Sequence, residues 1–205
     1  MSLQKNQQLL DQLFEIGAVR FGQFKLKIHK LQPEAPLCPI YFDLRIIRSF
    51  PQVMKLTVEA YHQASQGLSY DLLADIPLAS SPIIANLAWI LQKPMITPRP
   101  EVKKYGTKKT IEGVYTAGQT VLVVDDLVSQ GTSKLEVLAK LREARLKVRD
   151  ILVLIDREQG GAEVLAKQDC RLHAVFKVRQ ILDYYLQAGK ISTQKHQEVV
   201  DYLQS

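Results

Sequence analysis

The stretch VLVVDDLVSQGTS, residues 121–133, decides how the chain folds and what its site can bind. Four apolar residues precede Asp125 and Asp126, and the loop LVSQGTS follows them directly. An uninterrupted apolar run is typical of a parallel strand that is buried on both faces of a sheet. Carboxylates at the end of a buried strand lose solvation, so we expect partners for both acids at the mouth of a site.

The loop after the two acids has the composition of an anion site. Gly131 permits a backbone conformation that a side chain would forbid, and Thr132 and Ser133 supply hydroxyls where the next helix begins. Ser133 and Glu136 match a capping box at that helix start. Backbone N–H groups that lead into a helix N-terminus bind phosphate. The segment therefore predicts a phosphate site beside two carboxylates, which can hold ribose hydroxyls or lie near a metal.

Two common classes of nucleotide-binding protein are excluded by their missing motifs. A buried strand that ends in two acids also occurs beside the metal of nucleotide hydrolases, but such enzymes need GxxxxGK[ST]. The nearest match is GVYTAGQT at 113–120, where Gln119 replaces the lysine and a strand pattern follows instead of a helix. The sequence contains no GxGxxG, so a dinucleotide site of that type is not expected.

The rest of the chain alternates between apolar strand patterns and helical patterns. We therefore predict an α/β fold with a mostly parallel central sheet flanked by helices, in which ligands bind beyond the carboxyl ends of the strands. We expect a single domain with an N-terminal helix and hood strands (1–48), a core (49–178) and C-terminal helices (179–205). The predicted strands are 21–30, 40–45, 68–77, 94–96, 111–115, 120–126, 150–156 and 171–178, and the predicted helices are 4–16, 51–65, 82–92, 133–147, 161–167, 179–188 and 192–204.

Composition narrows the class of partner. The 205-residue chain carries a formal charge of +6, but its cations gather at 103–109, KKYGTKK, and a local cluster suits a small polyanion such as a diphosphate at least as well as nucleic acid, for which no long Lys/Arg run is present. No apolar run approaches the ~18 residues that span a membrane, and the N-terminus has no secretory pattern. Two cysteines without a CxxC partner indicate reduced thiols in a cytoplasmic protein. The four histidines lack metal-ligand spacing.

The thirteen-residue segment resembles the phosphoribosyl diphosphate (PRPP) motif of type I phosphoribosyltransferases. Over nearly the whole chain the sequence looks like the orotate phosphoribosyltransferase family, in the form that is fused in UMP synthase. DREQGG, at 156–161, is specific to orotate enzymes within the larger family. The resemblance is carried by FGQFKLK (21–27), PIYFDLR (39–45), YGTKKTIEG (105–113) and VLIDREQGG (153–161).

The resemblance implies a reaction and the residues that hold PRPP. Orotate and PRPP would give orotidine 5′-monophosphate and diphosphate, with Mg²⁺ held mainly by substrate and water. Asp125 and Asp126 would bind the ribose hydroxyls, and Lys103 would assist departure of the diphosphate, so Lys103 and Asp126 are the expected catalytic residues. Arg99 would also contact the diphosphate, and Tyr105 stands where relatives have His or Tyr. The 5′-phosphate would be held by Ser129, Gln130, Gly131, Thr132 and Ser133.

The resemblance also implies how orotate is bound. Arg157 would pair with the orotate carboxylate through two hydrogen bonds, which its planar fork suits. Lys27 would reach orotate from the hood, and Tyr41 and Phe42 match an aromatic pair against which the ring packs. Taken singly, Tyr41 and Phe42 also fit a strand core, Lys27 fits a solvated charge, and Arg157 fits a salt bridge to a neighbouring acid. In the family the 97–110 loop closes over the neighbouring subunit's site, so a homodimer with shared sites is expected.

Two positions depart from the family pattern. Pro100 stands where a lysine is expected, and a proline removes both a charge and a backbone donor. Asp75 stands where the diphosphate loop usually has glycine, and a carboxylate there would repel the ligand. Three alternatives follow: an active orotate enzyme, a phosphoribosyltransferase for another base, or a non-catalytic regulator that binds PRPP or a nucleotide.

Overall fold

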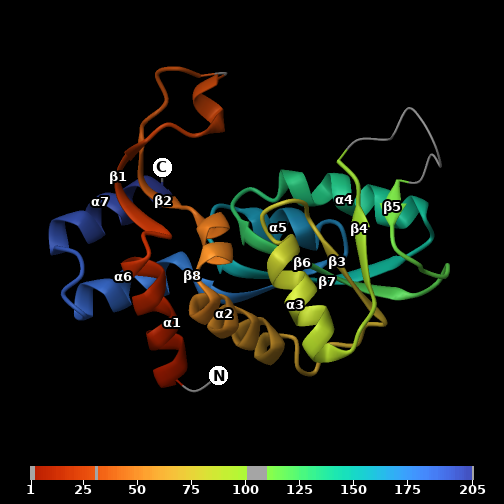
Figure 1. Cartoon of the computed structure of the whole chain (residues 1–205). Coiled ribbons are helices and arrows are strands. Elements are labelled where there is room, and N and C mark those ends of the chain that lie inside the picture. Colours follow the sequence, from red (N-terminus) through yellow and green to blue (C-terminus); the bar gives the residue numbers. More distant parts are fainter. Residues whose placement is uncertain (1–2, 31, 101–109, 205) are drawn as a thin grey trace.

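A computed structural model describes residues 3–30, 32–100 and 110–204, and its centre is a six-stranded sheet (Figure 1). The strand order is β5-β4-β3-β6-β7-β8. All neighbouring strands are parallel except β4 and β5, which confirms the predicted mostly parallel sheet. The strands are β3 (Leu72–Asp75), β4 (Met95–Pro98), β5 (Ile111–Glu112), β6 (Thr120–Val128), β7 (Lys147–Asp156) and β8 (Arg171–Lys177).

The register of the strands brings their acidic ends to one edge of the sheet. Asp75 pairs with Val124 across β3 and β6, and Val128 pairs with Asp156 across β6 and β7. The two acids at 125–126 therefore lie at the carboxyl edge, where the α/β rule predicts a ligand.

Alternate side chains along the strands bury two cores, as a sheet covered on both faces requires. Leu73 and Leu122 belong to the core beneath α1, α2, α3 and α6, whereas Val121 and Val123 belong to the core beneath α4 and α5. No helix within the described ranges is long and apolar enough to cross a membrane. The helices are α1 (Leu3–Glu15), α2 (Pro51–Ala64), α3 (Ser81–Leu91), α4 (Thr132–Glu143), α5 (Gly161–Ala166), α6 (Val178–Gln187) and α7 (Thr193–Gln204).

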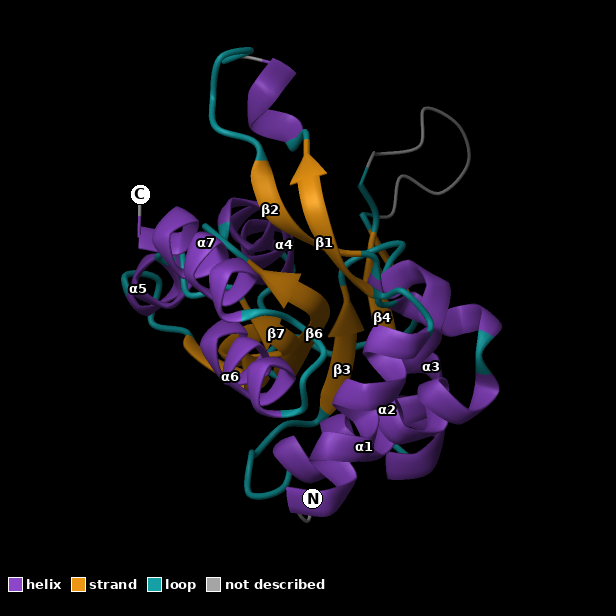
Figure 2. Cartoon of the chain, turned by 90° about the vertical axis from the view of Figure 1, so that its left-hand side faces the viewer, coloured by secondary structure: helices purple, strands orange, loops and turns teal. Residues whose placement is uncertain are grey.

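The hood is a separate two-stranded antiparallel sheet, β1 (Val19–Phe24) with β2 (Cys38–Phe42), and it stands beyond the carboxyl end of β3 (Figure 2). Two 3₁₀ helices flank it, η1 (Lys27–Lys30) and η2 (Leu44–Ser49). The prediction of one continuous strand over 21–30 was therefore wrong after residue 24. The turn that replaces it is fixed by a histidine ring, because the N–H of Leu26 donates to His29 Nδ1 at 2.9 Å.

Candidate active site

The hood and the carboxyl edge of the sheet enclose a cleft of about 1040 Å³. Its walls come from β2 and η2 on one side and from the β3–α3 and β6–α4 loops on the other. The described residues that line it include Tyr41, Phe42, Arg45, Arg48, Ile76, Pro77, Leu78, Ala79, Asp125, Asp126, Ser129, Gly131, Thr132, Ser133, Lys134 and Arg157. One cleft therefore brings together residues that are far apart in the sequence.

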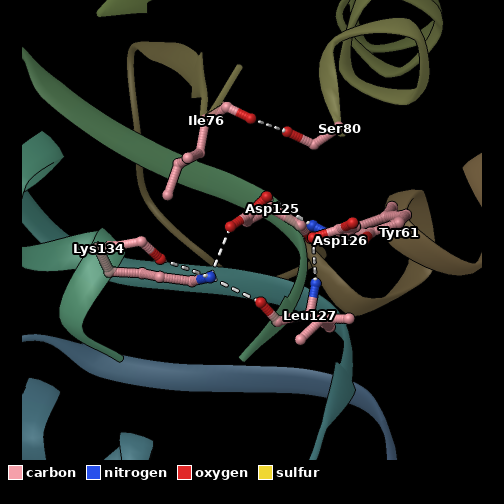
Figure 3. A network of polar contacts seen from close by, with 8 residues as sticks. Tyr61, Ile76, Ser80, Asp125, Asp126, Leu127 and Lys134 are labelled. Carbon is pink, nitrogen blue, oxygen red and sulfur yellow. Dashed lines mark hydrogen bonds and ion pairs between the residues drawn. The ribbon is translucent and has the colours of Figure 1, made fainter. Parts of the chain in front are cut away.

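The acid pair at the end of β6 is held by a polar network (Figure 3). Asp125 Oδ1 accepts from the backbone N–H of Asp126 at 2.9 Å, and Asp125 Oδ2 forms an ion pair with Lys134 Nζ at 2.6 Å. Asp126 Oδ1 accepts from the N–H of Leu127 at 2.7 Å. The Tyr61 hydroxyl donates to the carbonyl of Asp125 at 2.6 Å, which ties the strand end to α2. Both carboxylates are thus oriented before any ligand binds.

Burial, together with the charge of the neighbouring Asp125, raises the pKa of Asp126 to about 7. The folded protein therefore takes up a proton at Asp126 between the ordinary carboxyl pKa of 3.8 and about 7, and the ionised form costs stability as the pH rises through that window. Asp126 is therefore an acid whose ionised form is unfavourable for folding at neutral pH, although it lines the cleft.

Asp126→Asn should stabilise the protein against heat at pH 8, because the amide keeps the acceptor for Leu127 and removes the buried charge. We expect a rise in Tm of roughly 2–4 °C at pH 8, and a smaller rise at pH 5, where Asp126 is already protonated in the folded state. Thermal unfolding at the two pH values measures this difference, with the exposed Asp201→Asn as the matched control. An equal change in Tm at both pH values would contradict the raised pKa.

Glycines shape the β6–α4 loop. Gly131 has φ +78° and is the N-cap of α4, so helix α4 begins at Thr132. The predicted capping box between Ser133 and Glu136 was wrong, because Ser133 already lies inside the helix and no side chain caps it. The loop leads its N–H groups into the start of a twelve-residue helix, which is the geometry that binds phosphate.

The segment DREQGG packs against the residues that lead into α4, 129–133, which are called the phosphate loop below. The backbone N–H of Arg157 donates to Val128 O at 2.9 Å. A Cβ on Gly161 would lie 2.5 Å from Ser129 O and 2.7 Å from Val128 Cγ2, so only glycine fits there. At Gly131 a Cβ would lie 3.4 Å from Gly161 O, an ordinary contact, and a side chain there is disfavoured by the positive φ instead. The second glycine of the motif is therefore explained by close packing against the phosphate loop.

Asp75, which the sequence places in the diphosphate loop, lies beneath that loop. Its side chain is fully buried, and Ser81 Oγ donates to its Oδ2. The residues that line the cleft are those from Ile76 to Ala79, whose Pro77–Leu78 peptide bond is cis. Asp75 itself is not among the residues that line the cleft, so direct contact between its carboxylate and a ligand there is not expected.

Arg157 lines the cleft from the end of β7, although its side chain is almost fully buried. Its Nη2 donates to Cys38 Sγ at 3.3 Å, and the thiol in turn donates to Ile40 O at 2.9 Å. Arg157 Nε is buried without a hydrogen-bond partner among the described residues. An unsatisfied donor of this kind costs free energy, and a carboxylate ligand would supply the missing acceptor.

The described part of the chain brings together most of the predicted site. Exceptions are Gln130, which is exposed and does not line the cleft, and Arg99, whose guanidinium pairs with Glu112 on β5. Lys103 and Tyr105 lie outside the described residues, and so does the side chain of Lys27. Within the cleft the structure gathers Tyr41, Phe42, Asp125, Asp126, Ser129, Gly131, Thr132, Ser133 and Arg157.

Three cations of the cleft were missed by the sequence reasoning. Arg45 and Arg48 extend from η2, and Arg48 Nη2 donates to Leu78 O at 3.2 Å on the β3–α3 loop. Lys134 follows the phosphate loop directly, but a lysine in the first turn of a helix gives no sequence signal of burial. Among the described residues, no group of three or more His, Cys, Asp or Glu could hold a metal ion.

Comparison with known proteins decides the family. Models of protein families give no match. An orotate phosphoribosyltransferase of Pyrobaculum aerophilum is 32% identical over 196 residues, which cover 95% of this chain and 97% of that protein. The chain belongs to the orotate phosphoribosyltransferase family. The bifunctional enzyme PyrF/PyrE of Nostoc sp. is 40% identical over 187 residues, which are 91% of this chain but only 38% of that protein.

The family assignment agrees with the fold. The structure of Leishmania donovani UMP synthase superposes with a TM-score of 0.86 at 34% identity, over 97% of this chain and 42% of that one. The chain therefore has the fold of the orotate phosphoribosyltransferase family. Two of these relatives are much longer proteins, and the chain spans about two fifths of each.

Proposed function

We propose that this protein transfers the phosphoribosyl group of PRPP to orotate, which gives orotidine 5′-monophosphate and diphosphate. The observation that carries the proposal is that one cleft contains the acid pair, the phosphate loop and the buried arginine with an unsatisfied donor. They would serve as a ribose site, a phosphate site and a carboxylate site, which PRPP and orotate together require. In the reaction a ring nitrogen of orotate bonds to the anomeric carbon, and the bond from that carbon to the diphosphate oxygen breaks.

The ribose-5-phosphate half of PRPP would be held at the end of β6. Asp125 and Asp126 accept hydrogen bonds from the ribose hydroxyls, and the N–H groups and hydroxyls from Ser129 to Ser133 hold the 5′-phosphate. Because the transition state resembles an oxocarbenium ion, two carboxylates near the ribose stabilise its positive charge. The protein needs to position the reactants more than to form covalent bonds with them.

The diphosphate half would lie over the β3–α3 loop. Arg45 and Arg48 line the cleft there, and they supply positive charge that Pro100 does not. Lys103 and Arg99 remain the residues that the family pattern assigns to the diphosphate. Lys103 would stabilise the leaving group as the bond to the anomeric carbon breaks.

Mg²⁺ fits this site as an ion held by the substrate. Mg²⁺ prefers oxygen ligands and usually keeps several waters, with one or two carboxylates nearby and the rest from substrate phosphates. Asp125 and Asp126 are the two carboxylates of the cleft, and both are already engaged in hydrogen bonds. When bound with PRPP, the ion would neutralise part of the charge on the diphosphate.

Mg²⁺ alone should therefore leave the thermal stability of the protein unchanged, whereas Mg²⁺ with PRPP should raise Tm. A ligand that binds only the folded state at 100 times its Kd stabilises it by about 2.7 kcal/mol. Thermal unfolding is measured with chelator, with Mg²⁺, with PRPP and with both. A large rise with Mg²⁺ alone would show that protein side chains hold the metal, against this account.

Orotate would lie between the hood and the end of β7. Its carboxylate pairs with Arg157, and its ring packs near Tyr41 and Phe42, which line the cleft. Lys27, at the start of η1, is the further cation that the family pattern assigns to orotate. A negatively charged substituent on the ring is what this site selects, since an uncharged pyrimidine leaves the buried guanidinium without an acceptor.

A homodimer with shared sites would complete the enzyme, with the 97–110 segment of one subunit reaching its neighbour. The support is exposed apolar surface: on α3, Trp89 is 74% exposed and Ile90 is 43% exposed, and Leu78 in the preceding loop is 77% exposed. Exposed aromatic and aliphatic groups of this size are typical of subunit contacts.

The two cysteines of the chain are unpaired and buried, which supports a reducing compartment such as the cytoplasm.

Trp89→Glu should dissociate the dimer, because it places a charge in the apolar contact. Sedimentation equilibrium should then give one subunit mass where the parent protein gives two, and Leu3→Glu, which alters a comparably exposed residue of α1, should remain dimeric.

Mixing inactive Lys103→Ala subunits with inactive Asp126→Ala subunits should restore activity, because a mixed dimer has one intact site. A monomeric parent protein, or no recovery on mixing, would refute shared sites.

The function is tested by adding pure protein to orotate, PRPP and Mg²⁺ and following the absorbance of orotate. We expect loss of orotate only when all three are present. PRPP binding by calorimetry without a product from orotate, but with product from another base, would assign the enzyme to that base. Binding without any product would support the regulatory alternative instead.

A further inference from the structure

Lys134 occupies a position that ordinarily disfavours a lysine. It lies in the first turn of α4, where the helix dipole is positive, and it is only 5% exposed. Burial of an ammonium group costs solvation free energy unless partners compensate it. The family pattern of the phosphate loop ends at Ser133, so the reaction described above gives this residue no role.

The ammonium group of Lys134 joins three parts of the site (Figure 3). Nζ lies 2.6 Å from Asp125 Oδ2 and donates to Leu127 O at 2.6 Å. Ser133 Oγ, in the phosphate loop, is a third partner at 3.4 Å. An ammonium has three N–H donors, so these contacts use all of them. The acid pair, the end of β6 and the phosphate loop are thereby tied to one atom.

This contact fixes the orientation of the Asp125 carboxylate and compensates its negative charge. With Lys134 on Oδ2 and the backbone N–H of Asp126 on Oδ1, neither oxygen can rotate away without losing a partner. Both members of the ion pair have side chains only 6% exposed, so solvent screens the attraction little. Two adjacent carboxylates would otherwise repel each other and an anionic ligand, and the ammonium cancels one of these charges.

We propose that Lys134 is a positioning residue for PRPP, which holds the Asp125 carboxylate in place and couples it to the phosphate loop before the ligand binds. This inference rests on the proposed function, because PRPP is the ligand that needs a ribose site and a 5′-phosphate site at a fixed separation. Lys134 acts through Asp125, and its contribution is to ligand binding and not to the bond that breaks.

A double-mutant cycle tests the inference. The Kd of PRPP in the presence of Mg²⁺ is measured by calorimetry for the parent protein, Lys134→Met, Asp125→Asn and the double variant. We expect Lys134→Met to raise this Kd about 10-fold, which corresponds to about 1.4 kcal/mol, while the KM for orotate at saturating PRPP changes less than about twofold. In the Asp125→Asn background the same substitution should change the Kd less than about twofold, because its target is gone. Lys167→Met, which removes an exposed lysine outside the cleft, is the control for net charge.

Each other result contradicts the inference. An unchanged Kd in folded Lys134→Met removes the positioning role, and an equal loss in both backgrounds means that Lys134 does not act through Asp125. A parallel loss of PRPP and orotate affinity indicates a structural role only. If Lys134→Met does not fold because Asp125 is left unpaired, the double variant, which buries no lone charge, is compared with Asp125→Asn alone. If the parent protein does not bind PRPP, the proposed function fails first, and that result is distinct from the others.

Discussion

Arg157→Lys should raise the KM for orotate about 100-fold, because hydrogen bonds to charged groups contribute about 1.5–3 kcal/mol each and a lysine cannot form a bidentate pair. Lysine keeps the positive charge. The rise in the KM for orotate therefore measures the loss of the planar guanidinium and its paired hydrogen bonds, and not a loss of charge. Arg157 is held by the Cys38 thiol at Nη2, and its Nε is buried without a hydrogen-bond partner in the described part of the chain, which is the arrangement of a preorganised carboxylate site. A shorter, rotatable ammonium cannot satisfy both the thiol and the ligand.

Steady-state kinetics with orotate as the varied substrate measures this change. The Kd of PRPP should change less than about twofold, since Arg157 contacts Val128, just before the phosphate loop, through its backbone N–H, which lysine keeps. Arg149→Lys, an exposed arginine on the far part of β7, is the matched control and should leave both constants unchanged. A KM for orotate within about threefold of the parent value would remove Arg157 from orotate binding.

Gly161→Ala should abolish measurable PRPP binding and lower the stability of the protein. The added Cβ would lie 2.5 Å from Ser129 O, closer than any van der Waals contact allows, and the obstacle is backbone that cannot rotate away. Overpacking of this kind costs about 1–3 kcal/mol, and relief requires that the phosphate loop move. The expected result is a Tm lower by roughly 4–8 °C and a PRPP affinity reduced at least about 100-fold, because the loop N–H groups no longer converge on the phosphate.

Thermal unfolding and calorimetry check the two effects together. Gly22→Ala is the control, because its Cβ would meet only the ring of Phe24 at 3.3 Å, and a side chain at that distance can move. Orotate-site geometry should be less affected, since Arg157 is fixed by Cys38 on the hood side. A stable Gly161→Ala protein that binds PRPP normally would mean that DREQGG does not support the phosphate loop.

Much of the fold could be predicted because the strands are continuous apolar runs that end in acids. VLVVDD predicted β6, and its two carboxylates mark the site because buried acids need partners. Rules that use only neighbouring residues were less successful where tertiary packing determines where a helix begins or a strand ends. Helix α4 begins at Thr132 because Gly131 adopts positive φ as its N-cap, so the Ser133 capping box is not formed. The hood strand stops at residue 24, and beyond it the His29 ring, and not a cross-strand partner, accepts from the backbone N–H of Leu26.

The candidate site was predictable only in part, because the spacing of residues along the chain does not reveal how deeply each side chain is buried. Asp75 looked unfavourable in the sequence, but it is buried beneath the loop, where Ser81 donates to Oδ2 and Oδ1 has no hydrogen-bond partner among the described residues. Lys134 had no signal at all, since its partner Asp125 is separated from it by the whole phosphate loop. Arg99 follows β4 and pairs with Glu112 on β5, an edge strand of only two residues that the sequence predicted as longer.

The central claim is tested most directly by the products of a single reaction. Orotate, PRPP and Mg²⁺ are incubated with the protein, and orotidine 5′-monophosphate and diphosphate are quantified separately, with uracil, adenine and water alone as competing acceptors. We expect one orotidine 5′-monophosphate and one diphosphate for each orotate consumed, and no product from the other bases. Diphosphate release without orotidine 5′-monophosphate, or product from another base at a comparable rate, would contradict the assignment of orotate as the acceptor.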